Sequence, residues 1–164
     1  MLFPTFRKND RGATAIEFAF VAPMLIALII ATIEIGVLEV MSANLDSAVM
    51  TAARKIRTGA SDSPTSSAAL ADMICAEMID DSATCHTRLA TSVQTAATFA
   101  AAPATADATP TGQFYTSGPG DIVLIRATYR WPLILPMYAG NFSLSGPTSA
   151  LLDTRAAFRN EPYS

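Results

Sequence analysis

The fold is decided by residues 11–33, which read RGATAIEFAFVAPMLIALIIATI. Residues 18–33 carry no charge, and the apolar character extends back to Ala13 with only Glu17 interrupting it. About 20 apolar residues are enough for an α-helix to cross the hydrocarbon core of a bilayer. The stretch from Ala13 to Ile33 therefore predicts one membrane-spanning helix near the amino terminus.

The composition of the 164-residue chain agrees with contact to membrane lipid. Hydrophobic residues make up 51% of the chain and charged residues only 15%, which is more apolar than a typical soluble domain. The net charge is −3, and basic residues gather only in the first dozen positions and at residues 54–57. Nucleic acid is therefore not expected as a partner.

The charges on the two sides of the apolar stretch predict its orientation. Basic residues dominate before it and acidic residues follow it: Arg7, Lys8 and Arg11 with Asp10, then Glu34, Glu39 and Asp46. By the positive-inside tendency, the amino terminus lies in the cytoplasm and the rest lies across the membrane. A cleaved secretory signal is the alternative, but its apolar region is usually shorter. Because helical character continues through residues 33–41, we expect the anchor to be retained.

Glu17 is the unusual residue of this segment. A carboxylate near the centre of a bilayer costs about 2.5 to 3.5 kcal/mol, so it calls for a partner. The junction before it consists of a basic leader, Gly12, and small or apolar residues up to Glu17 and Phe18. Here the sequence resembles the type IV prepilins and, among them, the TadE-like pseudopilins, whose leader is cut after a glycine with a glutamate five residues later.

The resemblance implies cleavage between Gly12 and Ala13 by a prepilin peptidase. Cleavage would create an α-amino group at Ala13, and Glu17 of a neighbouring subunit could neutralise it in a low-dielectric helix bundle. Glu17 and Phe18 are therefore the expected assembly residues. The alternative is an uncut anchor, in which Gly12 merely flanks the helix and Glu17 reaches toward the headgroups.

The helical pattern continues beyond the membrane to about Arg57, and Gly59 is a plausible stop signal. A second helix is predicted over residues 66–78, and strands over residues 88–95, 121–131 and 149–159. Within the middle strand, one face should cover the first helix: Val123, Ile125, Ala127, Tyr129 and Trp131. The sequence thus predicts an α+β, pilin-like fold, with a long amino-terminal helix packed on a small antiparallel sheet.

A second resemblance lies toward the carboxyl end. Residues 131–136 (WPLILP) and 158–164 (FRNEPYS) are similar to the corresponding stretches of TadE-like proteins. The implied organisation is a cytoplasmic leader at 1–12, a transmembrane helix at 13–40 and a periplasmic pilin-like domain at 41–164. The implied function is that of a minor pseudopilin in the bacterial inner membrane, serving assembly of a Tad/Flp-type adhesion pilus.

Implied partners are the prepilin peptidase, other pilins or pseudopilins, and the inner-membrane assembly platform. The alternative function is a freestanding membrane-tethered periplasmic binding protein. That protein would meet its target through the Ala-, Thr-, Pro- and Gly-rich loop at residues 100–120, which shows no sustained periodicity.

Cys75 and Cys85 are the only cysteines, and both fall on the predicted periplasmic side, where disulfides persist. We expect them to pair with each other. The alternative is a metal site that uses both cysteines and His86, but adjacent Cys and His ligands fit the usual zinc spacings poorly. The expectation is therefore a disulfide and no metal.

Residues for catalysis are not assembled in any recognisable order. The chain has one histidine, no Gly-rich phosphate loop and no G-x-S-x-G sequence. We therefore expect no enzyme activity, no catalytic residues and no cofactor. The charged residues of the last two strands are instead expected to pair across an exposed sheet face: Arg126, Arg130, Asp153 and Arg155.

Overall fold

The computed structural model describes residues 11–101, 112–134 and 148–162. Most of the predicted leader therefore lies outside the described residues, as do half of the loop at 100–120 and part of the WPLILP stretch. The elements follow the order α1 (Arg11–Thr58), α2 (Ser67–Glu77), α3 (Ser82–Arg88), β1 (Leu89–Ala96), β2 (Ile122–Pro132) and β3 (Ser149–Arg159). The α+β prediction is confirmed.

Helix α1 runs without a break through Pro23 and ends where the sequence predicts. Gly59 adopts φ 62°, in the left-handed region that favours glycine. The amide of Ala60 donates to the carbonyl of Lys55 at 3.1 Å, and the amide of Gly59 donates to that of Ile56 at 3.2 Å. This pair of bonds is the Schellman motif, which satisfies carbonyls that the helix end would otherwise leave without partners.

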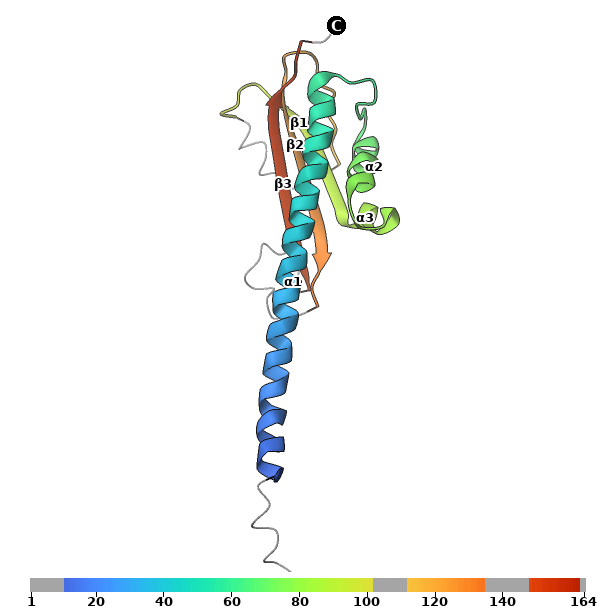
Figure 1. The fold of residues 1–164 in the computed structure, drawn as a ribbon. Helices are drawn as coiled ribbons and strands as arrows, with labels where there is room; N and C mark the ends of the chain where they lie inside the picture. Colours follow the sequence, from blue (N-terminus) through green and yellow to red (C-terminus); the bar gives the residue numbers. More distant parts are fainter. Residues whose placement is uncertain (1–10, 102–111, 135–147, 163–164) are drawn as a thin grey trace, which may run out of the picture. The chain divides into compact units, whose positions relative to one another are not determined.

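The chain divides into two compact units, residues 1–37 and residues 38–164. In the second unit, the three strands form an antiparallel sheet in the order β1-β2-β3. Residues 38–58 of α1 lie over one face of this sheet, with α2 and α3 beside them over β1 (Figure 1).

The core of this unit lies between the helices and the predicted face of β2. Val123, Ile125, Ala127 and Tyr129 are all fully buried there, with Trp131 packed against their edge. From α1, the buried residues recur at helical spacing: Met41, Leu45, Ala48, Val49, Ala52, Ala53 and Ile56. The apolar side chains that recur at every second position of the strand thus pack in one core against those that recur with the 3.6-residue period of the helix.

Helix α2 matches its prediction, whereas α3 was not predicted. Ser66 caps α2 by accepting a hydrogen bond from the amide of Ala69 at 3.1 Å. Asp81 caps α3 in the same way, accepting from the amide of Thr84 at 3.0 Å. The side chain of Thr84 and then this amide hold the pKa of Asp81 below its ordinary value. Because α3 includes Arg88, β1 begins at Leu89, one residue later than predicted.

The other face of β2 is less exposed than the sequence suggested. Ile122, Leu124 and Thr128 are buried there, and the side chain of Arg126 is only 12% exposed. The predicted pairing does occur. Arg126 donates two hydrogen bonds to Asp153, at 3.0 and 2.9 Å, and Arg155 donates a third at 3.0 Å. Asp153 therefore bridges Arg126 and Arg155, which lie opposite each other in the register.

Candidate assembly interface

The amino-terminal part of α1 exposes large apolar side chains along its length. Phe18 is 72% exposed, Phe20 76% and Met24 77%. An apolar surface this extensive is not left in water by a folded protein and marks a site for lipid or protein contact. The helix is long and apolar enough to cross a membrane, and few residues of its most apolar window are buried within the chain.

The predicted processing and assembly residues all lie in the first two turns of this helix. Gly12 and Ala13 are within α1, and Gly12 has open space where a side chain would stand. Glu17 and Phe18 are exposed one turn later. No hydrogen bond or ion pair joins Glu17 to any residue in the described part of the chain, so its carboxylate is available to a partner.

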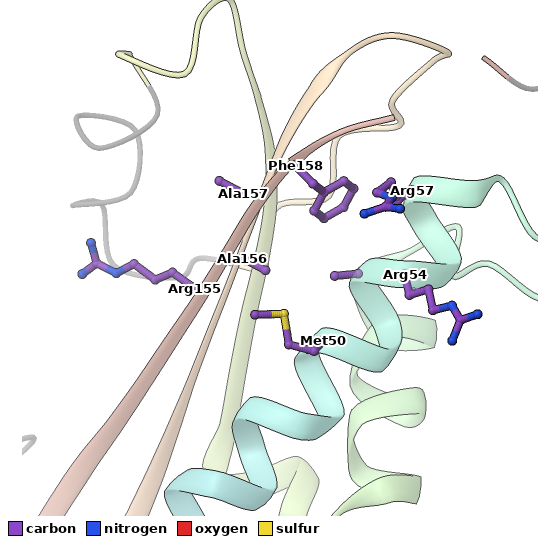
Figure 2. A pocket seen from close by; sticks show the side chains of 8 residues that line it. Met50, Arg54, Arg57, Arg155, Ala156, Ala157 and Phe158 are labelled. Atoms are coloured by element: carbon purple, nitrogen blue, oxygen red, sulfur yellow. The ribbon is translucent and has the colours of Figure 1, made fainter. Parts of the chain in front are cut away.

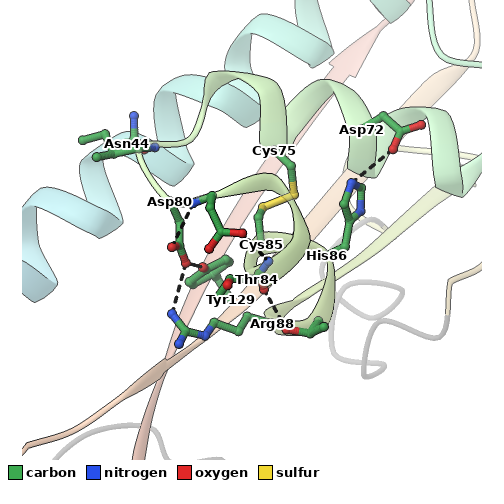
Figure 3. Close-up of a disulfide and its surroundings, with 12 residues drawn as sticks. Asn44, Asp72, Cys75, Asp80, Thr84, Cys85, His86, Arg88 and Tyr129 are labelled. Carbon is green, nitrogen blue, oxygen red and sulfur yellow. Dashed lines mark hydrogen bonds and ion pairs between the residues drawn. A yellow bond between two sulfur atoms is a disulfide. The ribbon is translucent and has the colours of Figure 1, made fainter.

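The predicted cysteine pair lies at the corner where α2 meets α3 (Figure 3). The sulfur atoms of Cys75 and Cys85 are 1.93 Å apart and both residues are buried. His86 faces the carboxylate of Asp72 at 3.2 Å and does not join the sulfurs in a metal site. The geometry is thus that of a disulfide between α2 and α3.

A polar cluster around Asp80, which the sequence did not predict, connects this corner to the sheet. The hydroxyl of Tyr129 donates a hydrogen bond to Asp80 Oδ2, and Nη1 of Arg88 donates to the same oxygen at 3.0 Å. Burial, together with the bond to Asp80, raises the pKa of Tyr129 to about 12. The guanidinium of Arg88 also lies 5.5 Å from the centre of the Trp131 ring, within cation–π range.

Asn44 of α1 holds the same corner from the opposite side. Its side-chain oxygen accepts from the amide of Ile79 at 2.9 Å, and its nitrogen donates to the carbonyl of Glu77 at 3.3 Å. The corner is therefore fixed by a disulfide, by the Asp80 cluster and by α1. The sequence predicted the disulfide, but no local pattern could have shown the bonds of Asn44 and Tyr129 to this corner, because their partners lie 33 residues or more away along the chain.

The structure gives two residues of the carboxyl-terminal Arg-Asn-Glu-Pro sequence a physical role. Asn160 is buried and its side-chain nitrogen donates to Ser117 Oγ at 2.9 Å and to the carbonyl of Gly118 at 3.0 Å. Glu161 pairs with Arg57 at 2.9 Å, and its amide donates to the Arg57 carbonyl, also at 2.9 Å. These residues join the end of β3 to a loop and to the end of α1.

The pairing of Cys75 with Cys85 is open to a direct test. We expect that native full-length protein, labelled with a thiol reagent under denaturing, non-reducing conditions, takes up no label, because both sulfurs are bonded to each other. After reduction it should take up two. Full labelling before reduction, or one equivalent of bound zinc, would contradict the disulfide.

Comparison with known proteins agrees with the amino-terminal geometry. The sequence model of the family described as TadE-like protein matches residues 12–54. No curated protein and no solved structure matches the chain. The matched segment begins at the predicted junction and covers nearly all of α1. This match confirms the resemblance seen in the sequence: the segment from residue 12 to residue 54 is similar to TadE-like proteins.

Proposed function

We propose that this protein is a minor pseudopilin-like structural component in the assembly of a Tad/Flp-type pilus. The observation that carries the proposal is the exposed carboxylate of Glu17 within an exposed apolar helix, in a segment where the TadE-like match begins at Gly12. An isolated carboxylate in lipid is costly, whereas the same carboxylate opposite an α-amino group in a helix bundle is compensated. A bundle of pilin helices offers that compensation.

In this role the helix at 13–40 crosses the bacterial inner membrane once, with the amino terminus in the cytoplasm. The domain at 41–164 then lies in the periplasm, where a disulfide between Cys75 and Cys85 persists. The partners are the prepilin peptidase, other pilins or pseudopilins, the assembly platform and membrane lipid. The proposal assigns the chain a structural role with no reaction to catalyse and no cofactor.

Processing at the Gly12–Ala13 junction is the test of this function. In cells with an active prepilin peptidase, we expect intact-mass measurement to find a chain that starts at Ala13. Gly12→Val should leave the leader attached, because a branched side chain would stand at the residue before the cut.

Gly36→Val is the matched control for this experiment. Gly36 lies in the same helix and also has open space where a side chain would stand, so its replacement should leave cleavage unchanged. A wild-type chain that stays uncut, or a mature chain with another first residue, would contradict the pseudopilin role. An uncut chain would instead favour the freestanding tethered binding protein.

A further inference from the structure

One end of the sheet is fixed to α1 at Leu38. Leu38, Leu133 and Ala150 are buried together there, with Trp131 packed against them. The amide of Leu133 donates to the carbonyl of Thr148 at 2.9 Å, which holds the end of β2 beside the start of β3. The place of Leu38 along the helix therefore also gives the place of this end of the sheet.

The end of β2 and the two residues after it, residues 131–134, leave part of their apolar surface uncovered. This segment, the β2 tip, has the uncharged sequence Trp-Pro-Leu-Ile. Leu133 is 9% exposed, whereas the next side chain, Ile134, is 74% exposed, and Pro132 is exposed as well. One half of the tip thus belongs to the core, and the other half presents apolar side chains outward.

The position of Leu38 in α1 sets the distance of the tip from a bilayer that the helix crosses. Residues 13–33 match the hydrocarbon core, which is about 30 Å thick. Leu38 follows Ile33 by five residues, about 7.5 Å further along the helix. With its headgroups a bilayer is about 40 to 45 Å thick, so each headgroup layer is about 5 to 7.5 Å deep. Leu38 and the tip packed on it therefore come at the level of the headgroups.

The side chains at this level suit a membrane surface. Val40 of α1 is 56% exposed, so the apolar surface of the helix continues to the tip. The indole N–H of Trp131 donates to no residue in the described part of the chain, and tryptophan is enriched at membrane–water boundaries. The charged neighbours in sequence, Glu39 and Arg130, are exposed and can stay among the headgroups.

We propose that the β2 tip inserts into the headgroup layer of the membrane that α1 crosses, with Ile134 directed toward the acyl chains. The partner is phospholipid, because the helix already holds the uncharged tip at that depth. The inference rests on the membrane crossing of the proposed function and adds a second contact between chain and bilayer. This contact restricts how the unit of residues 38–164 swings on its helix, which lowers the entropic cost of meeting a partner in the membrane.

Photo-cross-linking to lipid tests this contact on the full chain. A benzophenone amino acid replaces Ile134, and the protein is reconstituted in vesicles of phosphatidylethanolamine and phosphatidylglycerol. We expect illumination to add the mass of one phospholipid to the peptide that contains position 134, because the tip lies among lipids. No lipid adduct, or a link only to another copy of the chain, would overturn the proposal.

Met50 is the matched control position. It is another large apolar side chain, 59% exposed, and Figure 2 shows it at a groove between α1 and β3 that Ala156 and Phe158 also line. Because Met50 follows Leu38 by twelve residues, about 18 Å along α1, benzophenone there should add lipid about tenfold less often. Equal lipid addition at positions 50 and 134 would also overturn the proposal.

The fluorescence of Trp131, the only tryptophan, provides a second measurement. A phospholipid with a nitroxide on its headgroup should quench this emission in the same vesicles. Ile134→Asp leaves the core intact, because the side chain is exposed, and should lower the quenching about twofold or more, because a carboxylate withdraws from the acyl chains. Ile79→Asp, at an isoleucine that is 71% exposed on the α2–α3 corner, should not change the quenching. Unchanged quenching in the Ile134 variant would contradict the insertion.

Carbonate extraction of cell membranes separates this contact from the proposed function. A chain that stays in the membrane and starts at Ala13, but gives no lipid adduct at position 134, contradicts the contact alone. A chain that carbonate releases does not cross the membrane, and both proposals fail with it.

Discussion

Glu17→Ala is expected to abolish pilus assembly while the protein is still inserted and processed. If the carboxylate pairs with the Ala13 amine of an adjacent subunit, its removal leaves a positive charge without a partner in the bundle, a loss of about 3 to 5 kcal/mol. Insertion should survive, because removing a carboxylate makes the span more apolar. The measurements are the membrane level of the protein, its amino-terminal mass and the amount of pilus recovered from cells.

Glu39→Ala is the control for this experiment. Glu39 is an exposed carboxylate of the same helix, beyond the apolar stretch, and its loss should leave assembly unchanged. Wild-type assembly by the Glu17 variant would refute the pairing and favour a carboxylate that reaches toward the headgroups. Disappearance of the variant from the membrane would assign Glu17 a role in stability instead.

Asp80→Ala is expected to cause the largest loss of stability among single polar substitutions in the unit of residues 38–164, about 2 to 4 kcal/mol. The substitution leaves both the buried hydroxyl of Tyr129 and the guanidinium of Arg88 without their acceptor. Partial exposure of Arg88 moderates the loss, since water can replace one of the bonds. Urea unfolding of the full chain in detergent, followed by the signal of Trp131, measures the change.

Asp72→Ala is the matched control, because Asp72 is a carboxylate of the same region whose side chain is 71% exposed. Its pair with His86 should contribute at most about 1 kcal/mol. Tyr129→Phe removes the hydroxyl that donates to Asp80, so it removes part of the reason why Asp80→Ala lowers the stability. The double variant should therefore lose less free energy of unfolding than the sum of the losses in the two single variants. Equal losses for Asp72→Ala and Asp80→Ala would show that the cluster has no special role.

The helices and strands that the sequence predicted are those with sustained periodicity or clear end signals. Gly59 after a basic turn marked the end of α1, and the ends of β3 agree with the predicted residues 149–159. Helix α3 was missed because seven residues contain too few apolar positions to show a period. Asp81 followed by Ser82 was a capping signal that could have revealed it.

The contacts that fix the domain could not be predicted, because each depends on tertiary register. Asp80 meets Tyr129 across 49 residues and Arg57 meets Glu161 across 104. The alternation of β2 predicted its helix-facing side correctly, but the burial of Ile122 and Leu124 on the other side is not visible in an alternating pattern. The amino-terminal junction was recognisable because its residues lie within a few positions of each other.

Strand β3 comes after every other described element in the chain, and this order has a consequence for the timing of synthesis. Ala156 of this strand belongs to the core that α1 enters through Leu45 and Val49, and β3 is hydrogen-bonded only to β2. Helix α1 leaves the ribosome before β3, so the part of its apolar face that shares a core with Ala156 is covered only after that strand has followed. Until β3 has emerged, we expect a holding chaperone or the translocation channel to shield that face, and we expect a chain that stops before Ser149 to be degraded.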